Sequence, residues 1–361
     1  MNLGRHQIPD SLTYLEDLRS ALDPEEFRLA PEEIEDMRQL FKTMRVSKRL
    51  LKSQGPQAGV DLAHDSIDML RVMQWYFMQI GSYVQDYIRT QKNIDLQEVP
   101  IGCLPTLDVN AHAIRCKDGS SLILVEPGLV GLLHSLNVMV VSLRKFWPVW
   151  PGGSPLEDFN QNEINEYVKD IIRSFIFRLE SSCDVDFDPA ESGDRFRRFA
   201  NCYNLQSMST AQHMFILSHE FAHFLKGHLS SNSTEYRTLP FTRGRSVEFY
   251  KRSQEQEKEA DALGLELTLG CLKTYEKRIA GWNPWIRSSL RKMGMAGLHL
   301  LFIYFDVAEK VLSGRAGGPS THPPALERYE AITRQVPLSA DEVNWRLAMP
   351  VFKEIFAKIP T

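Results

Sequence analysis

Apolar residues recur at helical spacing in several long segments of the chain. An apolar residue every three to four positions is typical of a helix that packs one face against a core. The segments with this pattern are residues 64–93, about 128–141, 160–180, 209–228, roughly 246–274 and about 286–313. A Gly- and Pro-rich break then precedes a final pair of expected helices. We therefore expect a mostly α-helical protein.

Strand-like alternation of apolar and polar residues is found in residues 109–116. A Lys-Asp-Gly turn follows, and then the β-rich run SLILVE, residues 121–126. Two such runs joined by a tight turn are typical of a β-hairpin. Residues 230–246 are polar, and we expect them to form a loop. Together these patterns predict an α+β fold, mostly α-helical, with a small β-hairpin or sheet.

Composition narrows the class of protein. The 361 residues carry a net charge of -4 with both signs well mixed, which offers no basic surface for nucleic acid or anionic lipid. The five cysteines form no CxxC pair, so a reducing compartment fits best. The most apolar runs, residues 129–143 and 293–305, are shorter than the ~20 residues of a membrane span. The N-terminus has no apolar signal segment. We expect a cytoplasmic protein without a membrane span.

The stretch ILSHEFAHFLKGH, residues 216–228, holds three histidines and a glutamate in an apolar run. His219 and His223 are four residues apart, so on a helix they share a face and can offer two imidazole nitrogens to one ion. Glu220 lies beside them, where a carboxylate can deprotonate a water bound to the metal. The HExxH pattern also arises by chance, so a zinc site needs a third ligand.

Two candidates for the third ligand are disfavoured by position. The spacing HExxHxxGxxH would need glycine and histidine where the chain has Lys226 and Leu229. His228 follows His219 by nine residues, which at about 100° per residue places it on the opposite face of a continuous helix. We expect His228 to be a surface or capping residue.

A better candidate is Glu257, 34 residues after His223. Asp261 lies four residues later on the same helix face and can accept a hydrogen bond from the distal N–H of a ligating histidine. Ala260 and Gly264 are small enough to let another helix approach closely. The acidic run can also be read as a solvated helix face, which is what we expect of its other members, Glu255 and Glu259.

The order of three motifs resembles a known family. HExxH, then Glu257 and Asp261, then STHPPALERYEAI at residues 320–332 are similar to the gluzincin peptidases of the CaaX-prenyl-endopeptidase and heat-shock-protease type. The resemblance covers about residues 105–335, with an insertion near 145–205. It implies a zincin-like (minigluzincin) core with added N-terminal helices.

The same resemblance implies roles for individual residues. One zinc ion per chain would be bound by His219, His223 and Glu257, with Glu220 as general base. His322 would lie near the site and steady the oxyanion. Arg328 would pair with an acidic group or with the substrate.

The expected domains are a helical N-terminal region, residues 1–100, for docking or regulation, and a zincin-like metallopeptidase domain, residues 101–361. The expected function is limited endoproteolysis of a protein or peptide substrate, which would pair with the edge of the strand at 111–116 or 120–126.

Membrane members of the family span the bilayer, so their substrates are not implied for this chain. Soluble relatives include repressor-cleaving regulators and phage-exclusion peptidases. The alternatives are a zincin-fold sensor in stress or phage defence, which binds a partner through residues 1–100, and a metal-dependent hydrolase of a non-peptide bond.

Overall fold

A computed structural model describes residues 69–103, 110–116, 118–143, 202–230, 234–238, 246–250, 252–279, 284–313 and 323–336. Most of these residues are helical, and the fold is α+β with a small three-stranded sheet, as predicted. The helices are α4 (Met69–Gln91), α5 (Pro127–Leu143), α8 (Cys202–Leu225), α9 (Gln254–Ile279), α10 (Pro284–Ser313) and α11 (Ala325–Gln335). A short 3₁₀ helix, η4 (His228–Ser230), follows α8.

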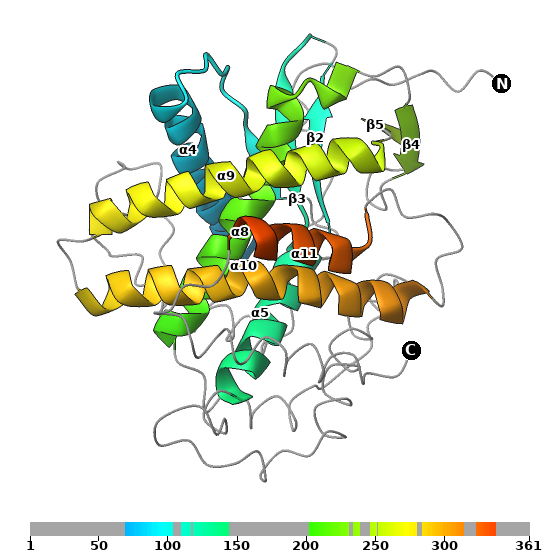
Figure 1. Cartoon of the computed structure of the whole chain (residues 1–361). Coiled ribbons are helices and arrows are strands. Elements are labelled where there is room, and N and C mark those ends of the chain that lie inside the picture. The colour runs from blue at the N-terminus through cyan, green and yellow to red at the C-terminus, as the bar shows by residue number, and fades with distance from the viewer. Residues whose placement is uncertain are drawn as a thin grey trace.

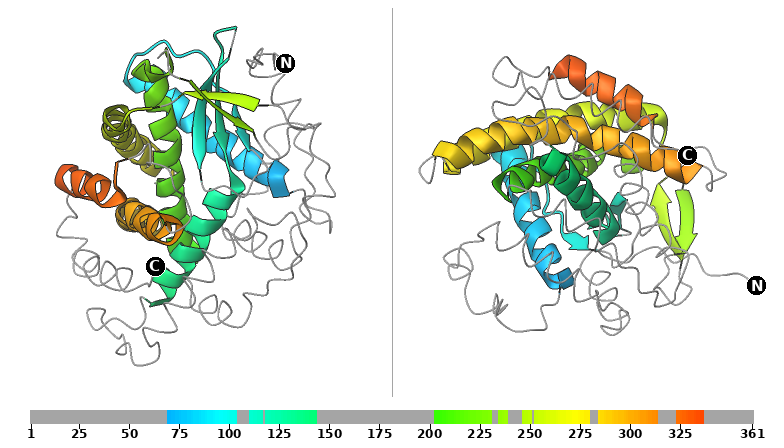
Figure 2. Two further views of the ribbon diagram at one scale, coloured as in Figure 1. Left: turned by 90° about the vertical axis from the view of Figure 1, so that its right-hand side faces the viewer. Right: turned by 90° about the horizontal axis from the view of Figure 1, so that it is seen from below.

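Helix α8 is the centre of the fold. It packs along α9 and α10, and it also contacts α4, α5 and the sheet. In the left view of Figure 2 it lies between the sheet on one side and α9, α10 and α11 on the other. Every side chain from Ser207 to His223 is buried. A helix enclosed on all sides has no solvated face, so the polar groups within it must find partners inside the protein.

The three-stranded sheet has the order β1-β3-β2, with β1 (Ile101–Cys103), β2 (Ala111–Arg115) and β3 (Ser121–Val125). Strands β2 and β3 form the predicted antiparallel hairpin, and the turn between them places Gly119 at φ 85°. Strand β1 pairs with β3 in parallel and was not predicted, because three residues are too few to show alternation. Strand β3 therefore has a neighbour on each side, and one of them is β2 (Figure 1). Strand β2 forms an edge of the sheet and contacts α8.

The predicted polar loop at residues 230–246 is wrong in part. Strand β4 (Thr234–Thr238) pairs antiparallel with β5 (Ser246–Tyr250). Both runs contain β-branched and aromatic residues, which favour strands, but their serines, arginines and glutamates hide the pattern from a reading based on polarity. The second strand also occupies the start of the helix expected at about 246–274.

Helix α9 begins at Gln254 because Ser253 caps its N-terminus. The Gln256 N–H donates to Ser253 Oγ at 3.2 Å, and the Ser253 N–H donates to Gln256 Oε1 at 2.9 Å. This reciprocal pair is a capping box, which satisfies two N–H groups at the helix start. The other helices in the described residues confirm the periodic pattern within a few residues, except that α8 begins at Cys202 and ends at Leu225.

Several predictions fall on residues that the structure does not describe: the helix at 160–180, the segment before residue 69 and most of the insertion near 145–205. The domain boundary near residue 100 stays a prediction. In the described part of the chain, no helix is both long and apolar enough to cross a membrane.

Candidate metal centre

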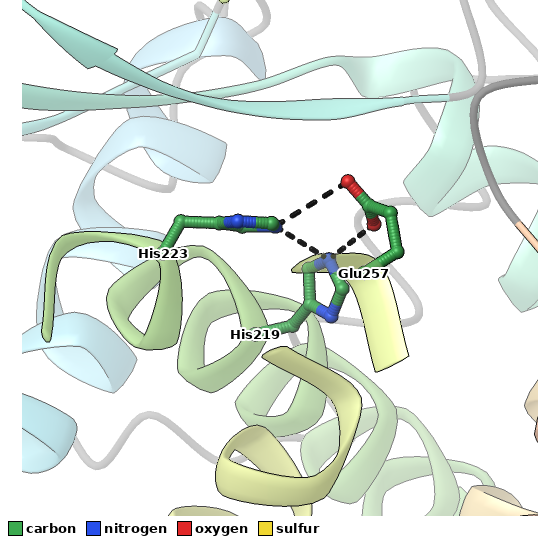
Figure 3. A group of neighbouring side chains, drawn as sticks. All are labelled: His219, His223 and Glu257. Atoms are coloured by element: carbon green, nitrogen blue, oxygen red, sulfur yellow. Dashed lines mark hydrogen bonds and ion pairs between the residues drawn. The ribbon is translucent and has the colours of Figure 1, made fainter. Parts of the chain in front are cut away.

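Helices α8 and α9 bring the three predicted metal ligands together. The Nε2 atoms of His219 and His223 lie 3.1 Å apart. Glu257 faces both of them, with 3.1 Å from Oε2 to His219 Nε2 and 3.6 Å from Oε1 to His223 Nε2 (Figure 3). One ligand atom from each residue lies within 4.8 Å of the other two, and all three side chains are buried. This group could hold a metal ion.

The close approach of α8 and α9 at this point depends on Gly264. A Cβ atom added at Gly264 would lie 2.9 Å from the Cα of His219. The prediction that small residues on α9 admit a neighbouring helix is therefore confirmed at Gly264, and the residue admitted is a predicted ligand.

Gly264→Ala adds a methyl group that pushes against the backbone of α8, at a cost of roughly 1–3 kcal/mol. Alanine favours a helix interior over glycine by roughly 1 kcal/mol, so the expected net destabilisation is up to roughly 2 kcal/mol. If the ligand group binds a metal ion, the variant should also bind it more weakly, since His219 must move. Urea denaturation and zinc titration measure the two effects. Ala262→Ser, at an exposed position two residues earlier, is the control. A Gly264→Ala protein as stable as the wild type would contradict this account of the contact.

A buried ion pair, formed by Asp261 and Arg328, lies on the Nδ1 side of His219. Asp261 Oδ1 lies 2.9 Å from His219 Nδ1. Arg328 on α11 donates to both oxygens of Asp261, from Nε and Nη2, at 2.7 Å each. The guanidinium also lies over the ring of Phe302, 4.9 Å from its centroid. The geometry thus brings both Asp261 and Arg328 to the site.

These charges shift two pKa values. Burial alone would lower the pKa of His219, but the carboxylates of Asp261 and Glu257 outweigh it and raise the pKa to about 9. Burial alone would raise the pKa of Asp261, but Arg328 and His219 outweigh it and hold it well below the ordinary value. In the metal-free protein His219 is therefore protonated at neutral pH.

Glu220 lies against the edge of the sheet. Its Oε2 accepts a hydrogen bond from the Ala113 N–H at 2.6 Å and another from Arg252 Nη2 at 3.1 Å. Its Oε1 lies 4.0 Å from His219 Nε2, on the side of the ligand group. One oxygen of the carboxylate is thus held by two donors, while the other oxygen faces the candidate ligand group.

Arg252 was not among the site residues that the sequence patterns predicted. Its Nη2 also donates to the Ala113 carbonyl at 3.3 Å, and its Nη1 lies 3.7 Å from Glu257 Oε1. It thus joins the sheet edge, Glu220 and a predicted ligand. The one signal in the sequence was a basic residue just before a helix N-terminus, where acidic residues are favoured.

The sheet edge at the site belongs to β2. In an antiparallel pair alternate residues point both backbone groups toward the partner strand, and those between them point outward. Ala113 is of the outward kind, since its N–H and C=O meet Glu220 and Arg252. The alternative edge at 120–126 is wrong, because β3 has strands on both sides.

His228 is neither exposed nor a cap, contrary to the sequence prediction. Helix α8 ends at Leu225, and Gly227 adopts φ 70°, so the chain turns back. His228 is buried, with its Nδ1 atom 3.0 Å from His223 Nδ1 and its Nε2 atom 3.1 Å from Glu259 Oε2. The prediction failed because it extended a straight helix past its end. His322, the other predicted catalytic residue, lies outside the described residues.

The chemistry of the group fits a metal. With Asp261 and His228 on the Nδ1 sides, the Nε2 atoms of His219 and His223 point toward each other and toward Glu257. Two imidazole lone pairs and a carboxylate are all acceptors, so this arrangement requires a cation or protons between them. Two nitrogens and a carboxylate oxygen suit zinc, and three protein ligands leave a position for water.

Comparison with known proteins identifies the family. The model of the Peptidase U49 family matches residues 162–348, more than half of the chain. The match includes His219, Glu220, His223, Glu257, Asp261 and Arg328. Searches of curated proteins and of solved structures gave no match. On the strength of the family match, the chain belongs to the Peptidase U49 family.

Proposed function

We propose that the protein is a zinc-dependent endopeptidase of the gluzincin type. The observation that carries the proposal is the convergence of His219, His223 and Glu257, with Glu220 beside them, in a chain of a peptidase family. A purely structural metal site has no use for an adjacent base, which favours an enzyme over a sensor.

His219, His223 and Glu257 would hold the zinc ion. When bound, zinc supplies a Lewis acid that polarises a carbonyl group and lowers the pKa of water toward ~7. Glu220 accepts a proton from the attacking water at Oε1 and passes it to the leaving amine. The Ala113 N–H and Arg252 hold Oε2, so the carboxylate does not need to reorient before the proton moves.

An extended substrate would pair with the outer edge of β2, which lies beside Glu220. Ala113 already uses its N–H and C=O within the protein. A substrate backbone would therefore pair with the outward groups on either side of Ala113 or displace Arg252 from its carbonyl. A regulatory partner for residues 1–100 is a separate proposal. Deletion of residues 1–68, which leaves the core helix α4 in place, would test it.

Zinc affinity is expected to rise with pH up to about 9. The pKa of His219 is about 9, so below that pH zinc must displace a proton from this ring, and apparent affinity gains about tenfold per pH unit. Chelator competition from about pH 6 to about pH 10 measures it. Asp261→Asn removes a charge that raises this pKa, so the dependence should move to lower pH. If zinc affinity does not change between pH 7 and 9, the proposed protonation of His219 is wrong.

A further inference from the structure

A series of polar contacts joins three side chains: His223, His228 and Glu259. His223 Nδ1 is 3.0 Å from His228 Nδ1, and His228 Nε2 is 3.1 Å from Glu259 Oε2. His228 is 5% exposed, whereas the Glu259 side chain is half exposed. The carboxylate thus reaches a buried ring from the protein surface.

The positions of the hydrogen atoms on the two rings can be assigned by starting from the Glu259 carboxylate. A carboxylate accepts, so it favours a proton on His228 Nε2 and leaves the Nδ1 atom of that ring with a lone pair. His223 must then donate from its own Nδ1. A neutral imidazole carries one N–H, so His223 Nε2 keeps its lone pair and points it toward Glu257 and His219.

The fold produces this contact by ending a helix. The Gly227 N–H donates to the Phe224 carbonyl at 3.1 Å, and the left-handed φ of Gly227 reverses the chain into η4. His228 consequently returns to the Nδ1 side of His223. Glu259 reaches it from α9, two residues after Glu257.

We propose that His228 and Glu259 position His223 and fix its tautomer for metal binding. This inference rests on the proposed zinc site. His228 is not itself a ligand, because it contacts the nitrogen of His223 that faces away from Glu257. The two ligand histidines are thus supported differently: His219 contacts the carboxylate of Asp261 directly, and His223 contacts that of Glu259 through a second ring.

Four variants of the full-length protein test the proposal by zinc affinity, measured with a competing chelator. His228→Leu removes the acceptor and should weaken zinc binding about 10–100-fold. His228→Asn places an amide oxygen near the position of Nδ1 and should recover most of this loss. Glu259→Ala should cost about tenfold, the lower end of that range, because its carboxylate is partly solvated. Glu255→Ala, an exposed glutamate on the same helix, should leave affinity unchanged.

A second measurement separates positioning from a general effect on the fold. ¹⁵N spectra of the metal-free protein with labelled histidine report the tautomer of each neutral ring, and the His223 signal is assigned by its loss in His223→Asn. The wild type should carry the His223 proton on Nδ1. Both His228→Leu and Glu259→Ala should give a mixture of tautomers, whereas simple destabilisation would lower the unfolding midpoint and leave the tautomer unchanged.

Clear results would overturn the inference. A folded His228→Leu protein with wild-type zinc affinity and tautomer would do so, and so would a Glu259→Ala protein that matches Glu255→Ala in both. If His228→Leu does not fold, the Glu259→Ala and His228→Asn proteins decide. Absence of zinc binding in the wild type would instead contradict the proposed function, while tight binding that is insensitive to these variants would contradict this inference alone.

Discussion

Glu220→Gln is expected to abolish peptide cleavage while leaving zinc bound at one ion per chain. A glutamine can still accept a hydrogen bond from the Ala113 N–H, but it cannot take a proton from water. Loss of a positioned general base costs typically 10²–10⁴-fold in rate. The three proposed metal ligands are untouched, so zinc content, measured by elemental analysis, should persist.

The cleavage experiment does not require a known substrate. New protein N-termini in a proteome incubated with the wild type, and missing from a sample incubated with Glu220→Gln, identify both the substrate and the cleaved bond. Glu266→Gln, at an exposed position on α9, is the control and should cleave as the wild type does. A cellular phenotype that survives Glu220→Gln would favour the sensor hypothesis over the enzyme.

The core of the candidate site was predictable because its spacing is local. His219 and His223 share a helix face by periodicity, and so do Glu257 and Asp261. Only the pairing of the two helices is long-range, and Gly264 hinted at it, since a small residue at helical spacing from two acids marks a place where another backbone can come close. The hairpin was predictable for the same reason, as its turn and its alternation lie within a short stretch.

The remaining parts depend on where elements end. His228 was misplaced because Gly227 ends the helical geometry, and one residue with a left-handed φ changes the direction of everything after it. Ser253 similarly shortens α9 at its start and leaves room for β5. Arg252 acts just outside that start, where no periodicity applies. Element ends follow from caps and single glycines rather than from apolar repeats, so a pattern-based reading misses them.

His219→Ala is expected to remove zinc from the protein. The variant deletes one of the three proposed ligand atoms, so the loss of zinc affinity should go well beyond the roughly 10–100-fold cost of losing a residue that only supports a ligand. Zinc content after dialysis should fall from one ion per chain to almost none, and cleavage should stop with it. Asp261 keeps its two hydrogen bonds from Arg328, so the fold should survive.

The matched control for this substitution is His213→Ala, which removes a buried histidine from the same helix away from the site. His213 Nδ1 lies 2.9 Å from the Tyr76 hydroxyl, and burial lowers the pKa of this ring to about 3, so it is neutral at neutral pH. Its loss should reduce stability in urea and leave zinc content at one per chain. If His219→Ala also kept one zinc ion per chain, the ligand set would be wrong, and if both variants lost zinc equally, the loss would reflect destabilisation rather than removal of a ligand.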